Sequence, residues 1–182
     1  MARCMGPSRA LLAALVVILA APAAGDYTVV GGRVVYEART RLSSWQGENT
    51  ALEGAIRLDP TDSRLSGQIC VALDRWQSGN FLRDLHTRRM FDVGRYPKAC
   101  FYPRRMLPTA DGASLAGVLH IRDVEREIQI RGLLTRLEGR MVFEGRFETR
   151  VSDWNMRAPT LAGVRVEDEV QVWVRVELRP SG

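Results

Sequence analysis

The stretch EVQVWVRVEL, residues 169–178, decides the fold class because every second residue in it is apolar. Val170, Val172, Val174 and Val176 fall on one side of an extended chain, while mostly polar or charged residues fall on the other. This alternation is typical of a β-strand with one buried and one solvated face. The stretch therefore predicts a half-buried strand.

The same alternation recurs along the chain, in residues 34–38, 52–58, 69–74, 99–101, 115–121, 128–130 and 141–147. Turn-forming runs separate several of these segments: DPTDS (59–63), TADGAS (109–114) and LEGR (137–140). About eight strands joined mainly by hairpins suit a closed barrel, since closure removes exposed edges. We therefore predict an all-β fold, an eight-stranded antiparallel barrel. A β-sandwich is the alternative that periodicity does not exclude.

The stretch SGNFLRDLHTRRMFDVGRYP, residues 78–97, interrupts this pattern. Asn80 is a good N-cap residue, and the spacing of Leu82 and Leu85 gives the following segment an apolar side. The Tyr-Pro pair at 96–97 favours a return to extended chain. We predict a short helix over residues 80–91 that caps one mouth of the barrel, with Leu82, Leu85 and Phe91 turned inward beside Trp76.

The inward positions of the strands and of this helix predict an apolar interior. A barrel of this size is either filled by side chains or holds one small ligand. Gly54, Gly117 and Gly145 fall on the inward face, where glycine relieves crowding or leaves room for a guest. The expected lining residues are Val34, Tyr36, Trp45, Leu52, Ile56, Ile69, Val71, Leu73, Trp76, Leu82, Leu85, Phe91, Phe101, Leu119, Ile121, Phe143 and Phe147.

Residues 78–101 resemble the hallmark of the YceI-like family: a Gly-Asn turn, an Arg-Asp-x-His segment, a Phe-Asp-Val and a Tyr-Pro that leads into a strand. Residues 34–59, 115–130 and 150–178 are similar to the flanking strands of that family. The resemblance implies a lipocalin-like barrel that is exported, with a pocket that in some members holds a long isoprenoid chain. It implies no shared catalytic activity. The hairpin at 122–127 departs from the family pattern, so no role of that hairpin is carried over.

The first 25 residues predict a secretory signal peptide. Arg3 and Arg9 precede an apolar run over residues 10–24, and small residues suit cleavage within 21–26. A membrane anchor is the alternative, but a spanning helix needs roughly 20 apolar residues. We therefore expect a barrel domain over residues 26–182, in a periplasmic or secreted protein.

The charge of the chain gives little sign of a nucleic-acid partner. Of the 26 basic residues all but Lys98 are arginine, and they are spread along the chain without the basic stripe and aromatic platforms of a nucleic-acid site. At the predicted mouth, the candidates for anion contacts are Arg83, His86, Arg88 and Arg89. The alternative is that these arginines form a solvated helix face.

Cys70 and Cys100 are the two cysteines that follow the predicted signal peptide, and an oxidising compartment would let them pair. Each lies opposite the inward residues of its strand, so the sulfurs meet if the two strands are neighbours in the right register. Neither a Cys-x-x-Cys nor paired histidines are present, so we predict no metal site. His86 has Asp84 two residues away, a spacing at which helical side chains do not face each other, and we predict no enzyme.

These observations favour an exported lipid-binding protein that holds an isoprenoid-type or similar amphiphilic ligand inside a β-barrel. Apart from that bound lipid we expect no cofactor, and the oligomeric state is left open. The alternative is a non-catalytic structural or stress-response protein with a filled barrel that partners a membrane or redox protein.

Overall fold

The computed structural model describes residues 25–59, 61–161 and 163–181. The predicted signal peptide thus lies outside the described residues, except for Gly25, which opens the first strand. The elements in chain order are β1 (Gly25–Arg39), β2 (Ser44–Asn49), β3 (Leu52–Asp59), β4 (Arg64–Ala72), η1 (Leu73–Arg75), α1 (Phe81–Phe91), β5 (Lys98–Thr109), β6 (Gly112–Ile121), β7 (Val124–Leu137), β8 (Arg140–Arg150), η2 (Val151–Trp154), β9 (Thr160–Leu161), β10 (Val164–Arg165) and β11 (Glu169–Pro180).

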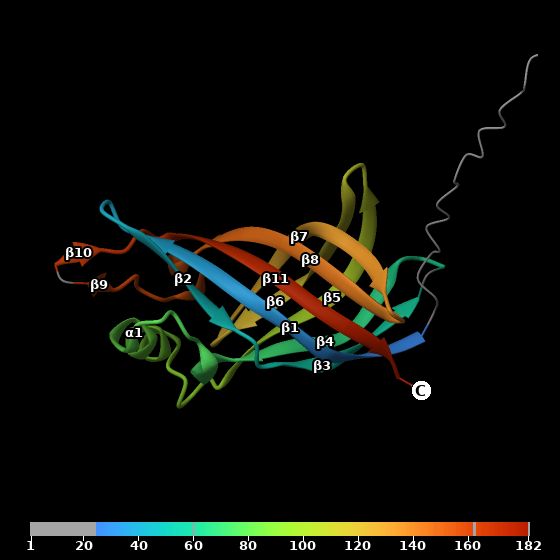
Figure 1. Cartoon of the computed structure of the whole chain (residues 1–182), viewed down its shortest axis with the longest axis horizontal. Coiled ribbons are helices and arrows are strands. Elements are labelled where there is room, and N and C mark those ends of the chain that lie inside the picture. Colours follow the sequence, from blue (N-terminus) through green and yellow to red (C-terminus); the bar gives the residue numbers. More distant parts are fainter. Residues whose placement is uncertain (1–24, 60, 162, 182) are drawn as a thin grey trace, which may run out of the picture.

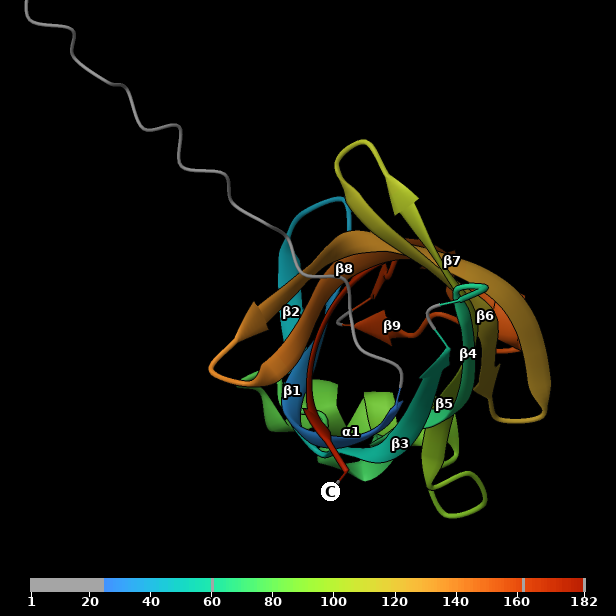
Figure 2. The ribbon, with the colours of Figure 1, turned by 90° about the vertical axis from the view of Figure 1, so that its right-hand side faces the viewer.

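The strands form a closed antiparallel barrel, as the alternation predicts. In the described part of the chain, β1, β3, β4, β5, β6, β7, β8 and β11 are hydrogen-bonded in that order, and β11 pairs back onto β1. Figure 2 shows these strands arranged in a ring. The prediction of an eight-stranded barrel is therefore confirmed, and the sandwich alternative is wrong.

The register of β11 explains why its valines alternate. Val172 pairs with Phe147 of β8 and Val176 pairs with Phe143, so these four side chains form one apolar row inside the barrel. The intervening residues carry polar groups on the outside, where Arg175 donates to Glu144 of β8 at 2.6 Å. The period of two thus places the valines of β11 inward and its charged residues outward, and Trp173 is the large apolar side chain on the outer side.

Strand β2 continues the line of β3 after a break at residues 50–51. The first part of β1 pairs with β3 (Thr28 with Ala55), and its last part pairs with β2 (Val34 with Asn49). Asn49 is buried and stabilises the break, because its side chain donates to the carbonyl of Ala72 at 2.7 Å and accepts from the amide of Ala51 at 2.9 Å. The sequence pattern did not predict this interruption.

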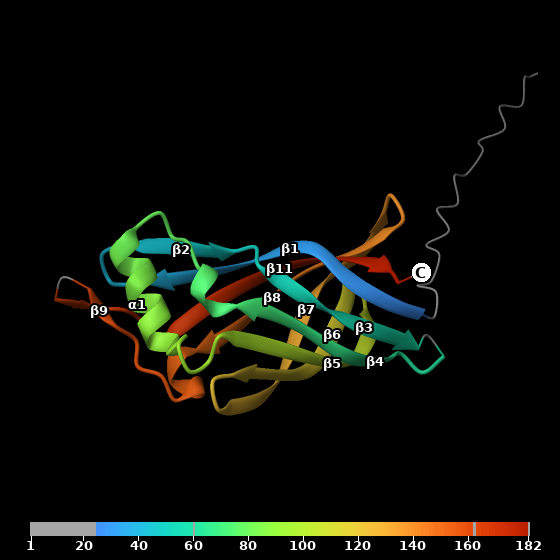
Figure 3. The same ribbon diagram turned by 90° about the horizontal axis from the view of Figure 1, so that it is seen from below.

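Helix α1 lies at the end of the barrel opposite the C-terminus, as Figures 1 and 3 show. It begins as predicted, because the Asn80 side chain accepts from the amide of Arg83 at 3.1 Å. Asp84 accepts from the amide and hydroxyl of Ser78, at 2.8 and 2.6 Å, and so ties the helix to the loop before it. Asp92 ends the helix in the left-handed conformation.

Apolar side chains pack together at the opposite end of the barrel. A buried apolar cluster packs there between the start of β1 and the end of β11, and its members are Tyr27, Ile56, Leu58, Leu65, Met141, Val176 and Leu178. A second cluster, Phe101, Ile130 and Phe143, lies further along the barrel. Except for Tyr27, the residues of both clusters also border open space inside the barrel.

Two of the glycines that were expected on the inward face, Gly54 and Gly117, do not leave open space in the interior of the barrel. A Cβ at Gly54, where φ is +139°, would lie 2.1 Å from the carbonyl oxygen of Gln68 on β4. A Cβ at Gly117 would lie 2.4 Å from the carbonyl oxygen of Tyr102 and 2.7 Å from the ring of Phe101. These glycines allow close approach of backbone and ring, so filling the barrel by mutation needs other positions.

Candidate functional site

A cavity of about 240 Å³ lies inside the barrel. All the barrel strands contribute to its wall, and almost every contributing side chain is apolar. An apolar cavity of about 150 Å³ already accepts a benzene-sized guest, so this space is much larger than a packing defect. The interior is thus suited to the apolar part of a ligand.

Most of the residues expected from the sequence to line the interior do so. They are Val34, Tyr36, Trp45, Leu52, Ile56, Ile69, Val71, Leu73, Trp76, Phe91, Phe101, Leu119, Ile121, Phe143 and Phe147. They come from strands of the barrel, from β2, from the segment around η1 and from the end of α1.

The expected inward direction of Leu82 and Leu85 is wrong. Leu82 is 62% exposed, and neither leucine contributes to the wall of the cavity. The helix instead presents Arg83, Thr87 and Met90 to the interior, at the i, i+4, i+7 spacing of a single helical face. The apolar residues at the start of α1 therefore face water, and its inner face carries polar groups.

Two of the four proposed anion-contacting residues lie at the cavity. Arg83 and His86 contribute to its wall, whereas Arg88 and Arg89 do not. The guanidinium of Arg83 lies over the ring of Trp45, with its carbon 5.4 Å from the ring centroid. This cation–π contact joins the helix to β2.

A polar cluster forms where α1 meets the barrel. The hydroxyl of Tyr36 on β1 lies 3.2 Å from the hydroxyl oxygen of Thr87, and its ring meets Trp76 edge-on with centroids 5.1 Å apart. Trp76 is only 5% exposed, yet its indole Nε1 is buried with no hydrogen-bond partner in the described part of the chain. One end of an otherwise apolar cavity is therefore polar.

Burial raises the pKa of the Tyr36 hydroxyl above its ordinary value, against the opposing effect of the hydrogen bond to Thr87. A tyrosine whose pKa is higher in the folded state loses folding stability as pH rises past the unfolded pKa near 10. As the pH is raised, the absorbance change of phenolate formation should include one tyrosine that ionises at a higher pH than an ordinary tyrosine. This step should be missing in Tyr36→Phe. Spectrophotometric titration of both proteins checks this, and superimposable curves after scaling for one tyrosine fewer would contradict it.

Sequence reasoning missed a group of residues that follow β8. Trp154 and Met156 line the cavity and pack with Val151 against Met90 and Phe91 of the helix. The indole of Trp154, unlike that of Trp76, donates to the hydroxyl of Thr149 at 2.9 Å. The signal in the sequence is the three-residue spacing of Val151 and Trp154, which places both on one side of a helical turn.

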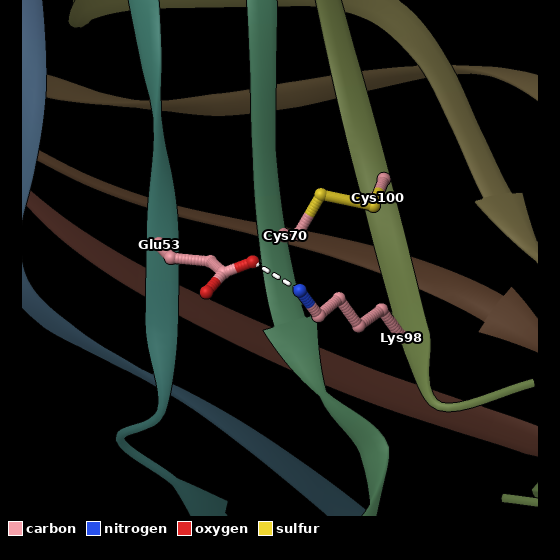
Figure 4. The surroundings of a disulfide bond; sticks show 4 residues. All are labelled: Glu53, Cys70, Lys98 and Cys100. Atoms are coloured by element: carbon pink, nitrogen blue, oxygen red, sulfur yellow. Dashed lines mark hydrogen bonds and ion pairs between the residues drawn. A yellow bond between two sulfur atoms is a disulfide. The ribbon is translucent and has the colours of Figure 1, made fainter.

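Cys70 and Cys100 form a disulfide between β4 and β5. They are direct partners in the register of the two strands, and their Cα atoms are 4.1 Å apart. Figure 4 shows an ion pair of Glu53 and Lys98 beside the bridge, on the same side of these strands. The disulfide joins the two strands that carry η1 and α1 between them, so it fixes both ends of the segment that covers the cavity.

No three His, Cys, Asp or Glu side chains in the described ranges lie together as metal ligands would. None of the helices in those ranges has the length and apolar character needed to span a bilayer.

Known structures share this fold at low sequence identity. The structure of BcnA from Burkholderia cenocepacia is 17% identical, with a TM-score of 0.70 over 80% of this chain and 95% of that chain. A polyisoprenoid-binding domain from Saccharophagus degradans, implicated in plant cell wall breakdown, is 16% identical, with a TM-score of 0.68 over 85% of this chain and 98% of that chain. The YceI protein of Campylobacter jejuni is 16% identical, with a TM-score of 0.63 over 79% of this chain and 90% of that chain.

Comparison with curated proteins gave no match. The model of the YceI-like domain family, in contrast, matches residues 28–178. This match covers the strands from β1 to β11 together with α1, which is most of the chain. The chain therefore belongs to the YceI-like domain family.

Proposed function

We propose that this protein is exported and holds an isoprenoid-type or similar amphiphilic lipid inside its barrel, without catalysis. The apolar cavity of about 240 Å³ carries the proposal, because a barrel with only a structural role would have its interior filled. The similarity in fold to a polyisoprenoid-binding domain supports it further. The polar cluster at α1 suits the polar end of an amphiphile.

The periplasmic or secreted location rests on the segment that precedes the barrel. Its basic start, apolar run and small residues suit removal by a signal peptidase, and a disulfide between Cys70 and Cys100 is consistent with an oxidising compartment.

Native mass spectrometry of the protein from the exported fraction of its own host tests both parts. The intact mass should correspond to cleavage within residues 21–26, with an additional mass that organic solvent removes and that fragments as an isoprenoid lipid. An uncleaved chain in that fraction would contradict export. A protein without bound lipid that also fails to take up geranylgeraniol would contradict the lipid-binding function.

A further inference from the structure

The indole N–H of Trp76 is a hydrogen-bond donor that the fold leaves without an acceptor. Trp76 is 5% exposed and lines the cavity, and its Nε1 has no partner among the residues that the structure describes. A buried tryptophan N–H usually finds a partner, because leaving such a donor unpaired is unfavourable. This atom therefore needs an explanation beyond packing.

The position of Trp76 is fixed by backbone contacts on both sides. The next residue, Gln77, exchanges two backbone hydrogen bonds with Glu48 of β2, at 2.8 and 2.9 Å. Before it, the amide of Leu73 donates to the carbonyl of Pro97 at 2.8 Å. The ring of Tyr36 packs edge-on against the indole of Trp76. With these contacts in place, the indole of Trp76 is held in the wall of the cavity.

The neighbouring groups make this end of the cavity suitable for an oxygen atom. His86 lines the cavity, and its ring makes no hydrogen bond or ion pair within the described ranges. Arg83 lines the cavity too, with its cation over Trp45 and with no acidic partner within the described ranges. The groups at this end can thus donate hydrogen bonds to a ligand oxygen, and most of the rest of the wall is apolar.

We propose that Trp76, with His86 and Arg83 beside it, binds an oxygen acceptor at one end of the ligand and so holds the ligand with its polar end at α1. The ligand class is an apolar chain that ends in a hydroxyl, carbonyl or phosphate oxygen, and a pure hydrocarbon is excluded from it. The inference rests on the proposed lipid-binding function and adds which end of the lipid is recognised and by which residues.

The test compares Trp76→Phe with wild type, using geranylgeraniol, its deoxy hydrocarbon counterpart and geranylgeranyl phosphate as probes. Phenylalanine keeps an aromatic ring against Tyr36 and removes the N–H. Displacement of a fluorescent apolar dye from the purified full barrel gives each affinity. Wild type should bind the alcohol about tenfold more tightly than the hydrocarbon, and Trp76→Phe should bind the two equally.

Trp154→Phe is the matched control. Trp154 lines the same cavity, but its N–H is already bonded to Thr149 at 2.9 Å. This variant should keep the preference for the alcohol and unfold at a lower temperature than wild type, because it loses a satisfied hydrogen bond. Both variants lose the same ring volume, so ligand-free Trp76→Phe should lose less stability than Trp154→Phe, since the N–H that it removes had no partner.

The outcomes separate this inference from the proposed function. Equal affinities of wild type for alcohol and hydrocarbon would overturn the inference and leave the lipid-binding function standing. A uniform loss of affinity for all probes in Trp76→Phe, the hydrocarbon included, would show a packing role and would also overturn it. If no probe binds, both proposals are overturned. Salt-sensitive preference for the phosphate over the alcohol identifies a phosphate end, and equal binding of the two identifies a neutral oxygen.

Discussion

Val174→Trp should abolish binding of geranylgeraniol while the protein remains folded. Val174 lies on β11, lines the cavity and packs against the cluster around Phe143. An indole there would occupy space that the apolar chain of the ligand needs. We expect the affinity to fall by about a hundredfold or more, which corresponds to about 3 kcal/mol. Dye displacement measures the affinity, and circular dichroism measures the fold.

Gln171→Trp is the control for this prediction, because it adds the same indole to the same strand on the outer face. Gln171 points outward and donates to Glu148 at 3.2 Å. The affinity of this variant should match that of wild type. A filled barrel would respond differently: wild type would bind no probe, and Val174→Trp would overpack the interior and lose about 1–3 kcal/mol of stability.

Reduction of the Cys70–Cys100 disulfide should lower the free energy of unfolding by about 3 kcal/mol. The bridge spans a sequence separation of 30 residues, and opening it increases the conformational entropy of the unfolded chain. For a domain of this size, that loss lowers the melting temperature by about 10 °C. Guanidinium unfolding of the protein with and without reductant measures the difference.

The double variant Cys70→Ala/Cys100→Ala provides the reference for this measurement. It should unfold at the same denaturant concentration with and without reductant, because it has no bridge to lose. If the two forms of wild type unfold together although thiol titration shows complete reduction, the bridge does not stabilise the fold.

The strands could be predicted from the sequence because alternation reports directly on which side of a strand is buried. The valines of β11 follow this rule, and the direct pairing of Cys70 with Cys100 needed only the correct register. The cap residue Asn80 likewise located the start of the helix, since its preference acts within one turn.

Which face of α1 points into the barrel could not be predicted from the sequence in the same way. Hydrophobicity alone selects Leu82 and Leu85 as the inner face, but the residues that line the cavity include Arg83 and Thr87. The inner face is polar because it meets the Tyr36 hydroxyl and the end of the cavity, and that environment is made by strands distant in the sequence. The contribution of Trp154 was missed for a related reason, since it depends on the path of the chain after β8.

The interrupted line of β2 and β3 leaves a weakly paired edge, the seam between β2 and Gln77, in the wall of the barrel. Beyond the break, β2 is paired with β1 on one edge, and on its other edge the described residues make one backbone bridge, from Glu48 to Gln77. Separating β2 from Gln77 at this seam breaks the two backbone hydrogen bonds between Glu48 and Gln77, which are worth about 1–3 kcal/mol together. It also breaks side-chain contacts of α1. If the barrel holds a lipid as proposed, we expect that lipid to enter or leave at a rate set by this seam, while every ladder between the barrel strands stays intact. Amide hydrogens at Glu48 and Gln77 should accordingly exchange with solvent far faster than those in the middle of β11, and independently of global stability.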